Sequence, residues 1–348
     1  MGLTWPEFLE NNKRPLPPLE DRDISGRTVI VTGANTGIGY EIAKYMAKFG
    51  ASKVIAACRN EAKGHDAIAR IAKETGRDSG TLECWPLDFA SMSSVRRFAQ
   101  RYNKSGLPLH IFVHNAGMNG IGKIISEDGF DMMLQVNYLA PALLSMLLYP
   151  VLAGTGALDK AHPARFLWVM SEGSAVIPFD EPLDAHPIEA LNKKFYELVD
   201  NRESEDSRLQ YFAAKLACLL ACHEYARRIP ASANIAVATA APGLVATELG
   251  QKDVNGNNLH LIDLEPVFTI RPRTPEEGAR TIVLAATYPV EEVWKAGTRH
   301  VPFFTNMQEM DTEYFVAKSG DPELRRKVWD DTVRVLKLTD DEVDICFL

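Results

Sequence analysis

The sequence predicts an α/β protein built on a doubly wound parallel sheet of about seven strands, with helices on both faces. Three observations predict this class. Short apolar runs alternate along the chain with longer segments whose apolar residues recur at helical spacing, the order that a parallel sheet with crossover helices needs. A glycine-rich turn over 32–39 separates the first such run from the first helix. The length of 348 residues suits one large α/β domain or two small ones.

Six candidate strands are apolar enough to be buried, and a seventh belongs at an edge. The seventh, around 299–303, contains Pro302, which lacks the N–H group that a central strand donates. We expect a single domain over 24–348, preceded by a polar, proline-bearing N-terminal arm over 1–23 that lies on the surface. The six buried strands are expected at 27–32, 53–58, 81–87, 109–114, 165–170 and 234–240.

Two inserts are too long to be plain connections. Residues 172–210 contain a short apolar-faced helix and a charged run, and residues 248–273 carry several apolar side chains. We expect these inserts to form a lid over an apolar substrate pocket. Residues 304–348 are expected to be a helical extension, because Asp321 and Pro322 are typical of a helix start and precede apolar residues on one helix face.

Composition narrows the partners and the compartment. The formal net charge of −8 argues against nucleic acid or an anionic membrane surface as a partner. No apolar run is expected to span a membrane, and we expect no membrane anchor. Five cysteines without a CxxC pair, and without a secretory signal before them, favour a reduced, cytoplasmic location.

Two cysteines on one predicted helix raise the question of a metal site. Cys218 and Cys222 lie four residues apart and His223 follows them. Metal ligation is one interpretation, but two small buried side chains on one helix face are the commoner arrangement. No metal is assigned.

The glycine turn is expected to bind phosphate. Gly33, Gly37 and Gly39 lie between a buried strand and an amphipathic helix, where missing Cβ atoms let the backbone approach a ligand and the helix N–H groups favour an anion. The spacing is Gly-x-x-x-Gly-x-Gly, which differs from the commoner dinucleotide pattern Gly-x-Gly-x-x-Gly. The turn is predicted to hold a pyrophosphate.

The residue after the second strand indicates the form of the dinucleotide. Arg59 follows that strand about twenty residues after Gly39, where such folds contact the adenosine ribose. No acid ends the strand to hold a free 2′-hydroxyl, and a guanidinium suits a 2′-phosphate. The sequence therefore predicts NADP(H) rather than NAD(H). An arginine that simply faces solvent is the alternative, which Glu61 nearby keeps open.

A tyrosine and a lysine are candidates for proton transfer. Tyr211 and Lys215 are four residues apart on a predicted helix and therefore share one face. Lowering a phenol pKa by about 3 units requires about 4 kcal/mol, which an ammonium about 4 Å away supplies at an effective dielectric near 20. Ser171 ends the fifth strand, at the edge of the sheet where ligands bind.

Taken in order, these motifs resemble the short-chain dehydrogenase/reductase family, whose fold is the Rossmann sheet. The matching segments are the turn at 32–39, Asn115-Ala116-Gly117 with His114 in place of the family's first Asn, and Tyr211-x-x-x-Lys215. Pro242-Gly243-x-x-x-Thr247 extends the match. The resemblance is closest to the retinol dehydrogenase-like branch and its fungal biosynthetic reductases, although the 40-position interval between Ser171 and Tyr211 exceeds that of most members.

The resemblance implies roles for individual residues. Tyr211 would protonate the carbonyl oxygen and Ser171 would hydrogen-bond it. Lys215 would hold the ribose hydroxyls and tune Tyr211, while Asn137 would anchor a water that relays protons to Lys215. The cofactor-binding residues that it implies are Gly33, Asn35, Thr36, Gly37, Ile38, Gly39, Arg59, Asn60, Asp88, Phe89, Asn115, Ala116, Gly117, Tyr211, Lys215, Pro242, Gly243, Val245 and Thr247.

The activity expected is that of an NADP(H)-dependent oxidoreductase, which interconverts a carbonyl and an alcohol on an apolar substrate of small to medium size. A role in secondary metabolism would fit. The alternatives are reduction of a C=C bond or epimerisation on the same fold, and a non-catalytic NADP-binding regulator. Many relatives form homodimers through helices corresponding to 125–150 and 209–228, a pairing that the long inserts could block.

Overall fold

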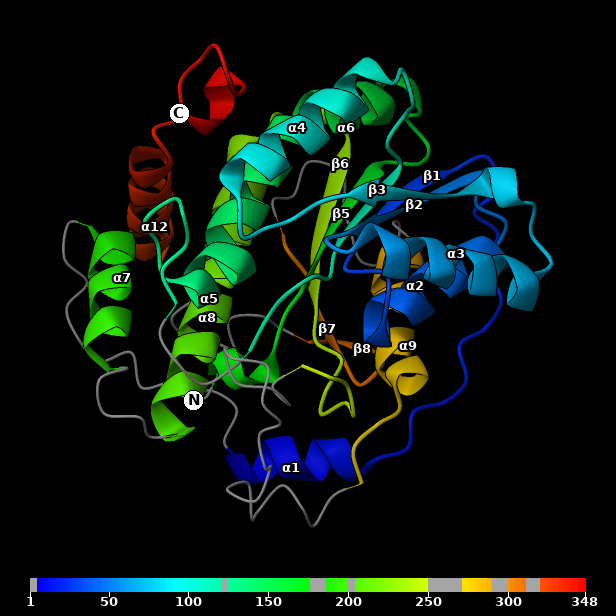
Figure 1. The fold of residues 1–348 in the computed structure, drawn as a ribbon, viewed down its shortest axis with the longest axis horizontal. Helices are drawn as coiled ribbons and strands as arrows, with labels where there is room; N and C mark the ends of the chain where they lie inside the picture. Colours follow the sequence, from blue (N-terminus) through cyan, green and yellow to red (C-terminus); the bar gives the residue numbers. More distant parts are fainter. Residues whose placement is uncertain are drawn as a thin grey trace.

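The computed structural model describes residues 5–119, 124–175, 186–198, 204–249, 271–289, 300–310 and 320–348. Within them, one sheet has eight strands in the order β3-β2-β1-β4-β5-β6-β7-β8 (Figure 1). Seven strands run parallel, and only β8 is antiparallel to its neighbour. The strands are β1 (Thr28–Thr32), β2 (Lys53–Cys58), β3 (Leu82–Pro86), β4 (Ile111–His114), β5 (Ala164–Val169), β6 (Ile235–Ala240), β7 (Phe303–Thr305) and β8 (Gln308–Met310).

The predicted doubly wound sheet is confirmed, but the expected edge is wrong. The strand expected around 299–303 is β7, which begins only at Phe303 and pairs with both β6 and β8. Asn306 and Met307 adopt positive φ values of 52° and 58° and form a two-residue turn between β7 and β8. Such turns usually contain glycine. Because this turn contains none, the sequence did not indicate a hairpin here.

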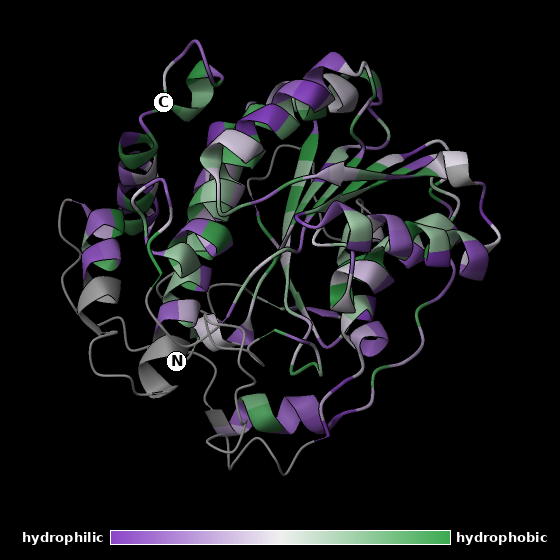
Figure 2. Ribbon diagram, in the orientation of Figure 1, coloured by the Kyte–Doolittle hydropathy of each residue, from purple (hydrophilic) through white to green (hydrophobic). Residues whose placement is uncertain are grey.

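Helices cover both faces of the sheet. In Figure 1, α4, α6 and α8 lie on one side of the strands and α2, α3 and α9 on the other. Two clusters of buried apolar side chains fill these interfaces, and Figure 2 shows hydrophobic strands between helices whose outer surfaces are largely hydrophilic. The helices are α2 (Gly37–Lys48), α3 (Glu61–Thr75), α4 (Met92–Lys104), α6 (Ala140–Leu158), α8 (Ser204–Arg228) and α9 (Pro275–Thr287).

The helix that includes α6 contradicts the expectation that no apolar run is long enough to span a membrane. α5 (Met132–Leu134), a single π-turn (Gln135–Leu139) and α6 form a continuous helix over Met132–Leu158. By length and composition alone this helix could cross a membrane, although 78% of its most apolar window is buried inside the protein. It is apolar on most sides because the sheet and the neighbouring helices surround it. Its composition therefore reflects a core position.

The N-terminal arm contains a helix, α1 (Trp5–Lys13), that was not expected from the sequence. It lies across the edge of the sheet where the strands end (Figure 1). The following stretch is held to α9, because Arg280 Nη1 donates to the carbonyls of Leu16 at 2.7 Å and Pro17 at 3.1 Å. The arm is thus part of the packed fold.

The C-terminal extension supports the first insert. α12 (Pro322–Leu336) carries Asp331, whose carboxylate accepts the N–H groups of Ile188 at 2.7 Å and Glu189 at 3.1 Å. These two residues open α7 (Pro187–Leu198), the helix of the 172–210 insert. Most of the 248–273 insert and parts of the first lie outside the described residues. The lid therefore stays a prediction.

Substituting Asp331 tests this support. Its side chain is 1% exposed and also accepts Arg334 Nε at 2.7 Å. We expect Asp331→Asn to lower the free energy of unfolding by about 1–3 kcal/mol, because the N–H groups of Ile188, Glu189 and Arg334 lose their charged acceptor. Asp330→Asn is the matched control, because Asp330 is 53% exposed and its ion pair is worth at most about 1 kcal/mol. Equal losses in denaturant unfolding would contradict this role.

Candidate active site

In the glycine turn, the backbone around Gly39 lies very close to Gly33 and Asn115. Gly33 and Gly37 have φ values of +67° and +58°, which L side chains rarely adopt. A Cβ on Gly39 would lie 2.3 Å from the Gly33 carbonyl oxygen and 2.5 Å from Asn115 Nδ2. Within the described chain, the N-cap Thr36 makes no side-chain capping bond to α2. The first N–H groups of α2 therefore remain available to an anion.

Thr32 holds the ends of β1 and β4 together. Its hydroxyl oxygen accepts the N–H groups of Asn115 at 3.0 Å and Ala116 at 2.9 Å, and its carbonyl accepts Asn115 Nδ2 at 2.9 Å. β1 and β4 are adjacent in the sheet although β2 and β3 lie between them in sequence. The chain order reverses at this point, where open α/β sheets bind their ligands.

His114 fits the position where the resembled family has Asn. The ring is buried, and Nδ1 lies 3.2 Å from Thr32 Oγ1. Phe89 and Trp168 pack against the ring edge-on, with centroids 5.2 Å and 5.8 Å away. Burial lowers the pKa of His114, with the positive charge of Lys215 acting in the same direction. The ring is therefore neutral and helps to organise the strand ends.

Asn137 lies in the π-turn and holds the loop after β4. Its Oδ1 accepts the Met118 N–H at 2.9 Å, and its Nδ2 donates to the Met118 carbonyl at 2.8 Å. A Cβ on Gly117 would lie 2.8 Å from Asn137 Oδ1 and 3.9 Å from Lys215 Nζ. Isolated π-turns inside helices often mark functional sites. Here the turn brings Asn137 beside the loop and the lysine.

The two helix cysteines lie in the protein core. Cys218 and Cys222 are both buried on α8. The Cys218 thiol donates to the Asn137 carbonyl at 3.1 Å, so one of the pair has a specific role in holding the π-turn. His223 is also buried, and burial lowers its pKa to about 3.

The remaining predicted catalytic residues meet at the end of β5. α8 carries Tyr211 and Lys215, and Lys215 Nζ lies 5.8 Å from the centre of the Tyr211 ring. Lys215 Nζ donates to the Val169 carbonyl at 2.9 Å, which places the amine under the last residue of β5. Ser171, two residues further on, hydrogen-bonds the Tyr211 phenol. The structure therefore brings together Asn137, Ser171, Tyr211 and Lys215.

The expected lowering of the Tyr211 pKa is wrong for this structure. Burial raises the pKa of the phenol, Cys218 adds to the increase, and the hydrogen bond with Ser171 opposes it. Burial also lowers the pKa of Lys215. The cost of burying a charged phenolate outweighs the attraction of the ammonium on which the expectation was based. The phenol is protonated at neutral pH, which is the form that donates a proton.

The predicted adenosine-side residues lie at the ends of β2 and β3. Arg59 is exposed directly after β2, and Asn60 caps α3 by accepting the Lys63 N–H at 3.0 Å. Asp88 follows β3 and accepts the Ala90 N–H at 2.9 Å, while Phe89 is buried. These four residues lie at the ends of neighbouring strands, as expected.

The segment after β6 approaches the glycine turn from the other side. A Cβ on Gly37 would lie 3.4 Å from the Thr247 methyl group, so the two segments are in contact. Gly243 has a φ of +78°, and a Cβ there would lie 2.2 Å from Arg273 Nη1. Val245 pairs with Arg273 in an isolated bridge.

Three buried polar residues that the sequence did not predict lie beside this segment. Asn12, Glu172 and Arg273 are 4%, 1% and 4% exposed. They come from α1, the short 3₁₀ helix after β5 (Glu172–Ala175) and the loop before α9. Their only signal in the sequence is that Glu172 directly follows Ser171. The three residues meet only through contacts between segments that are far apart in the chain.

Comparison with known proteins agrees with this geometry. A family model described as short chain dehydrogenase matches residues 27–172. The dehydrogenase/reductase SDR family member FEY of Arabidopsis thaliana is 30% identical over 342 residues, covering 96% of this chain and 83% of its own. Human retinol dehydrogenase 14 is 31% identical over 326 residues, covering 88% and 84%. A crystal structure of an uncharacterised Mycobacterium paratuberculosis protein superposes with a TM-score of 0.60 at 23% identity, covering 91% and 96%.

A pair of glycine substitutions tests the turn. Gly39→Ala forces a Cβ against backbone, so we expect loss of dinucleotide binding and about 1–3 kcal/mol of stability. Gly154→Ala is the control, because Gly154 lies on α6 and a Cβ there would meet nothing within 4 Å. That change should leave binding intact and raise stability by about 0.5–1 kcal/mol. Calorimetry that finds normal binding by the Gly39 variant would refute the assigned turn.

Proposed function

The chain belongs to the short-chain dehydrogenase/reductase family, in its retinol dehydrogenase-like branch, and on that premise we propose an NADP(H)-dependent oxidoreductase that interconverts a carbonyl and an alcohol. The observation that carries the proposal is the meeting of Ser171, Tyr211 and Lys215 at the end of β5. A phenol, a hydroxyl and an amine there match the needs of proton transfer to a carbonyl oxygen.

The residues present fit a dinucleotide. The Gly33–Gly39 turn has no room for side chains on its inner positions and presents the start of α2, as a pyrophosphate site requires. Thr247 lies against Gly37 from the opposite side. Thr32 holds Asn115 and Ala116 where the ends of β1 and β4 adjoin, and Gly117 follows them in the chain. When bound, the nicotinamide would supply the hydride.

Tyr211 is proposed as the general acid for reduction. Its phenol is held protonated by burial and oriented by Ser171. In reduction, the phenol proton passes to the carbonyl oxygen while Ser171 hydrogen-bonds that oxygen. In the reverse direction the phenol must first give up its proton, so alcohol oxidation should gain rate as pH rises. A well-placed acid of this kind contributes roughly 10²–10⁴-fold.

Lys215 and Asn137 are proposed to support this step. One N–H of the Lys215 ammonium goes to the Val169 carbonyl, which leaves two donors to hold ribose hydroxyls. Both polar atoms of the Asn137 side chain are bonded to Met118. The side chain therefore holds the loop, and a water relay to Lys215 would use the Asn137 backbone carbonyl, which already accepts the Cys218 thiol.

The substrate class and the cofactor form are part of the proposal. A relative named retinol dehydrogenase supports an apolar alcohol or its carbonyl partner as substrate. Exposed Arg59 at the end of β2 supports NADP(H), since a guanidinium pairs with a 2′-phosphate. A cytoplasmic location, a place in secondary metabolism and a homodimer remain proposals of the same kind.

Replacing Tyr211 with Phe tests the reaction. We expect turnover of apolar aldehydes and ketones with NADPH to fall at least about 10²-fold, because the proton donor is lost, while NADPH still binds. Tyr225→Phe on the same helix is the matched control, since Tyr225 lies in the core with only a 3.4 Å bond to the Ser145 carbonyl. Equal turnover by wild type and the Tyr211 variant would disprove this acid.

Replacing Arg59 tests the cofactor form. Arg59→Ala should weaken NADPH binding by about 10- to 100-fold, the value of a charge-assisted bond to phosphate, and leave NADH binding unchanged. Arg97→Ala, at an exposed position on α4, serves as the control. Titrations with both nucleotides read the result. Tighter binding of NADH than NADPH by the wild type would end the NADP(H) proposal.

A further inference from the structure

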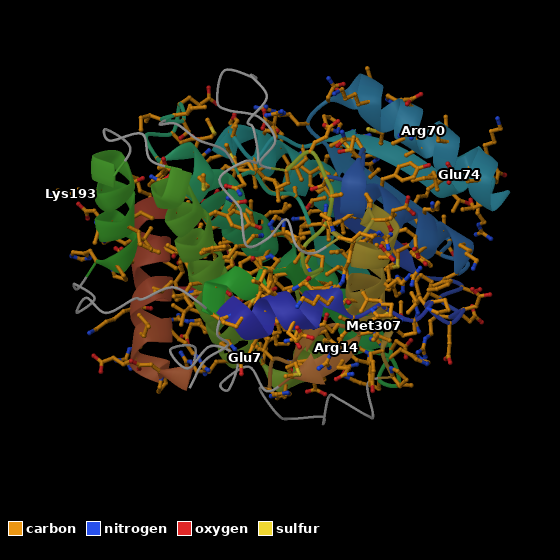
Figure 3. All side chains as sticks on the ribbon, turned by 90° about the horizontal axis from the view of Figure 1, so that it is seen from below. Glu7, Arg14, Arg70, Glu74, Lys193 and Met307 are labelled. Carbon is orange, nitrogen blue, oxygen red and sulfur yellow. The ribbon has the colours of Figure 1, made fainter. Side chains whose placement is uncertain are left out.

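A cluster of buried polar groups lies between α1 and the candidate active site. Asn12, Glu172, Arg273 and Thr305 come from four segments that are far apart in sequence, and each is at most 4% exposed. Figure 3 looks onto this side of the molecule and shows α1 crossing it between Glu7 and Arg14. The mechanism described above uses none of these side chains.

Asn12 connects the loops that follow β5 and β6. Its Oδ1 accepts the Leu244 N–H at 2.7 Å, and its Nδ2 donates to Glu172 Oε2 at 3.2 Å. Leu244 lies within the Pro242–Thr247 segment, and Glu172 directly follows Ser171. One amide therefore bridges the segment assigned to the cofactor and the loop that carries the serine.

The other partners of Glu172 complete this arrangement. Its Oε1 accepts the hydroxyl of Thr305, the last residue of β7. Arg273 provides a nearby positive charge to the carboxylate and donates through Nη1 to the Pro242 carbonyl at 2.9 Å. Both carboxylate oxygens of Glu172 and both polar atoms of the Asn12 side chain have hydrogen-bond partners, as buried polar groups usually do. Such matching fixes orientation, which apolar packing alone would leave looser.

We propose that Asn12 and Glu172, here named the clasp, are positioning residues for the oxidoreductase reaction. The clasp sets the spacing between Ser171 and the Pro242–Thr247 segment, so the N-terminal helix is part of the active-site framework. This inference rests on the proposed function. The arm remains attached through Arg280 when the clasp is broken, so clasp variants should fold.

Exchanging the two groups tests the clasp. Asn12→Asp keeps the acceptor for Leu244 but sets two carboxylates against each other, and we expect the NADPH dissociation constant to rise about tenfold with a fall in kcat. Adding Glu172→Gln restores a donor facing Asp at position 12, keeps an acceptor for Thr305 and returns the local charge beside Arg273 to its wild-type value. The double variant should recover most of the lost affinity and kcat.

Asn11→Asp is the matched control, since it makes the same charge change one position away on α1. Thermal unfolding is recorded for every variant, and NADPH titrations are made well below each melting temperature. A purely structural role would lower the melting temperature and leave NADPH affinity unchanged. Wild-type affinity in the Asn12→Asp protein, or a double variant as weak as that single variant, overturns the clasp and leaves the proposed function standing. A wild type that binds neither pyridine nucleotide removes both.

Discussion

The rest of the site depends on the hydrogen bonds that the Thr32 hydroxyl accepts. By accepting the N–H groups of Asn115 and Ala116, it joins the ends of two strands that are neighbours in space and separated by two others in sequence. Gly39 must lack a side chain because Gly33 and Asn115 occupy the space where a Cβ would go. Close contacts between backbone groups therefore hold the strand ends together at this reversal of chain order, which is where open α/β sheets bind their ligands.

Burial determines the chemistry of the groups beside these strand ends. Partial burial raises the pKa of the Tyr211 phenol and so keeps it protonated, while burial lowers the pKa of Lys215, which is 3% exposed. Such groups persist only when each has a defined partner. Ser171 and the Val169 carbonyl provide those partners. The end of β5 must therefore pack against the face of α8 that carries Tyr211 and Lys215.

Local patterns in the sequence were sufficient to predict the parallel sheet, the glycine turn and the serine, tyrosine and lysine at its edge. Strands and glycine turns are specified by residues that are neighbours in the chain, so β-branched runs and glycine spacing predict them. The β7–β8 turn could not, because Asn306 and Met307 adopt positive φ without glycine. The pKa of Tyr211 depends on how much water the fold excludes, and the role of Asn12 depends on segments about 160 and 232 positions away. These properties arise only from tertiary packing.

The geometry of the site predicts a dinucleotide over the end of the sheet, with its phosphates on the glycine turn and its nicotinamide beside Tyr211. A crystal structure of the protein with NADP⁺ tests it most directly. We predict the pyrophosphate against Gly33–Gly39 and the nicotinamide ring next to the Tyr211 hydroxyl, with Lys215 on the ribose. A nucleotide bound elsewhere, or a nicotinamide remote from Tyr211, would contradict it.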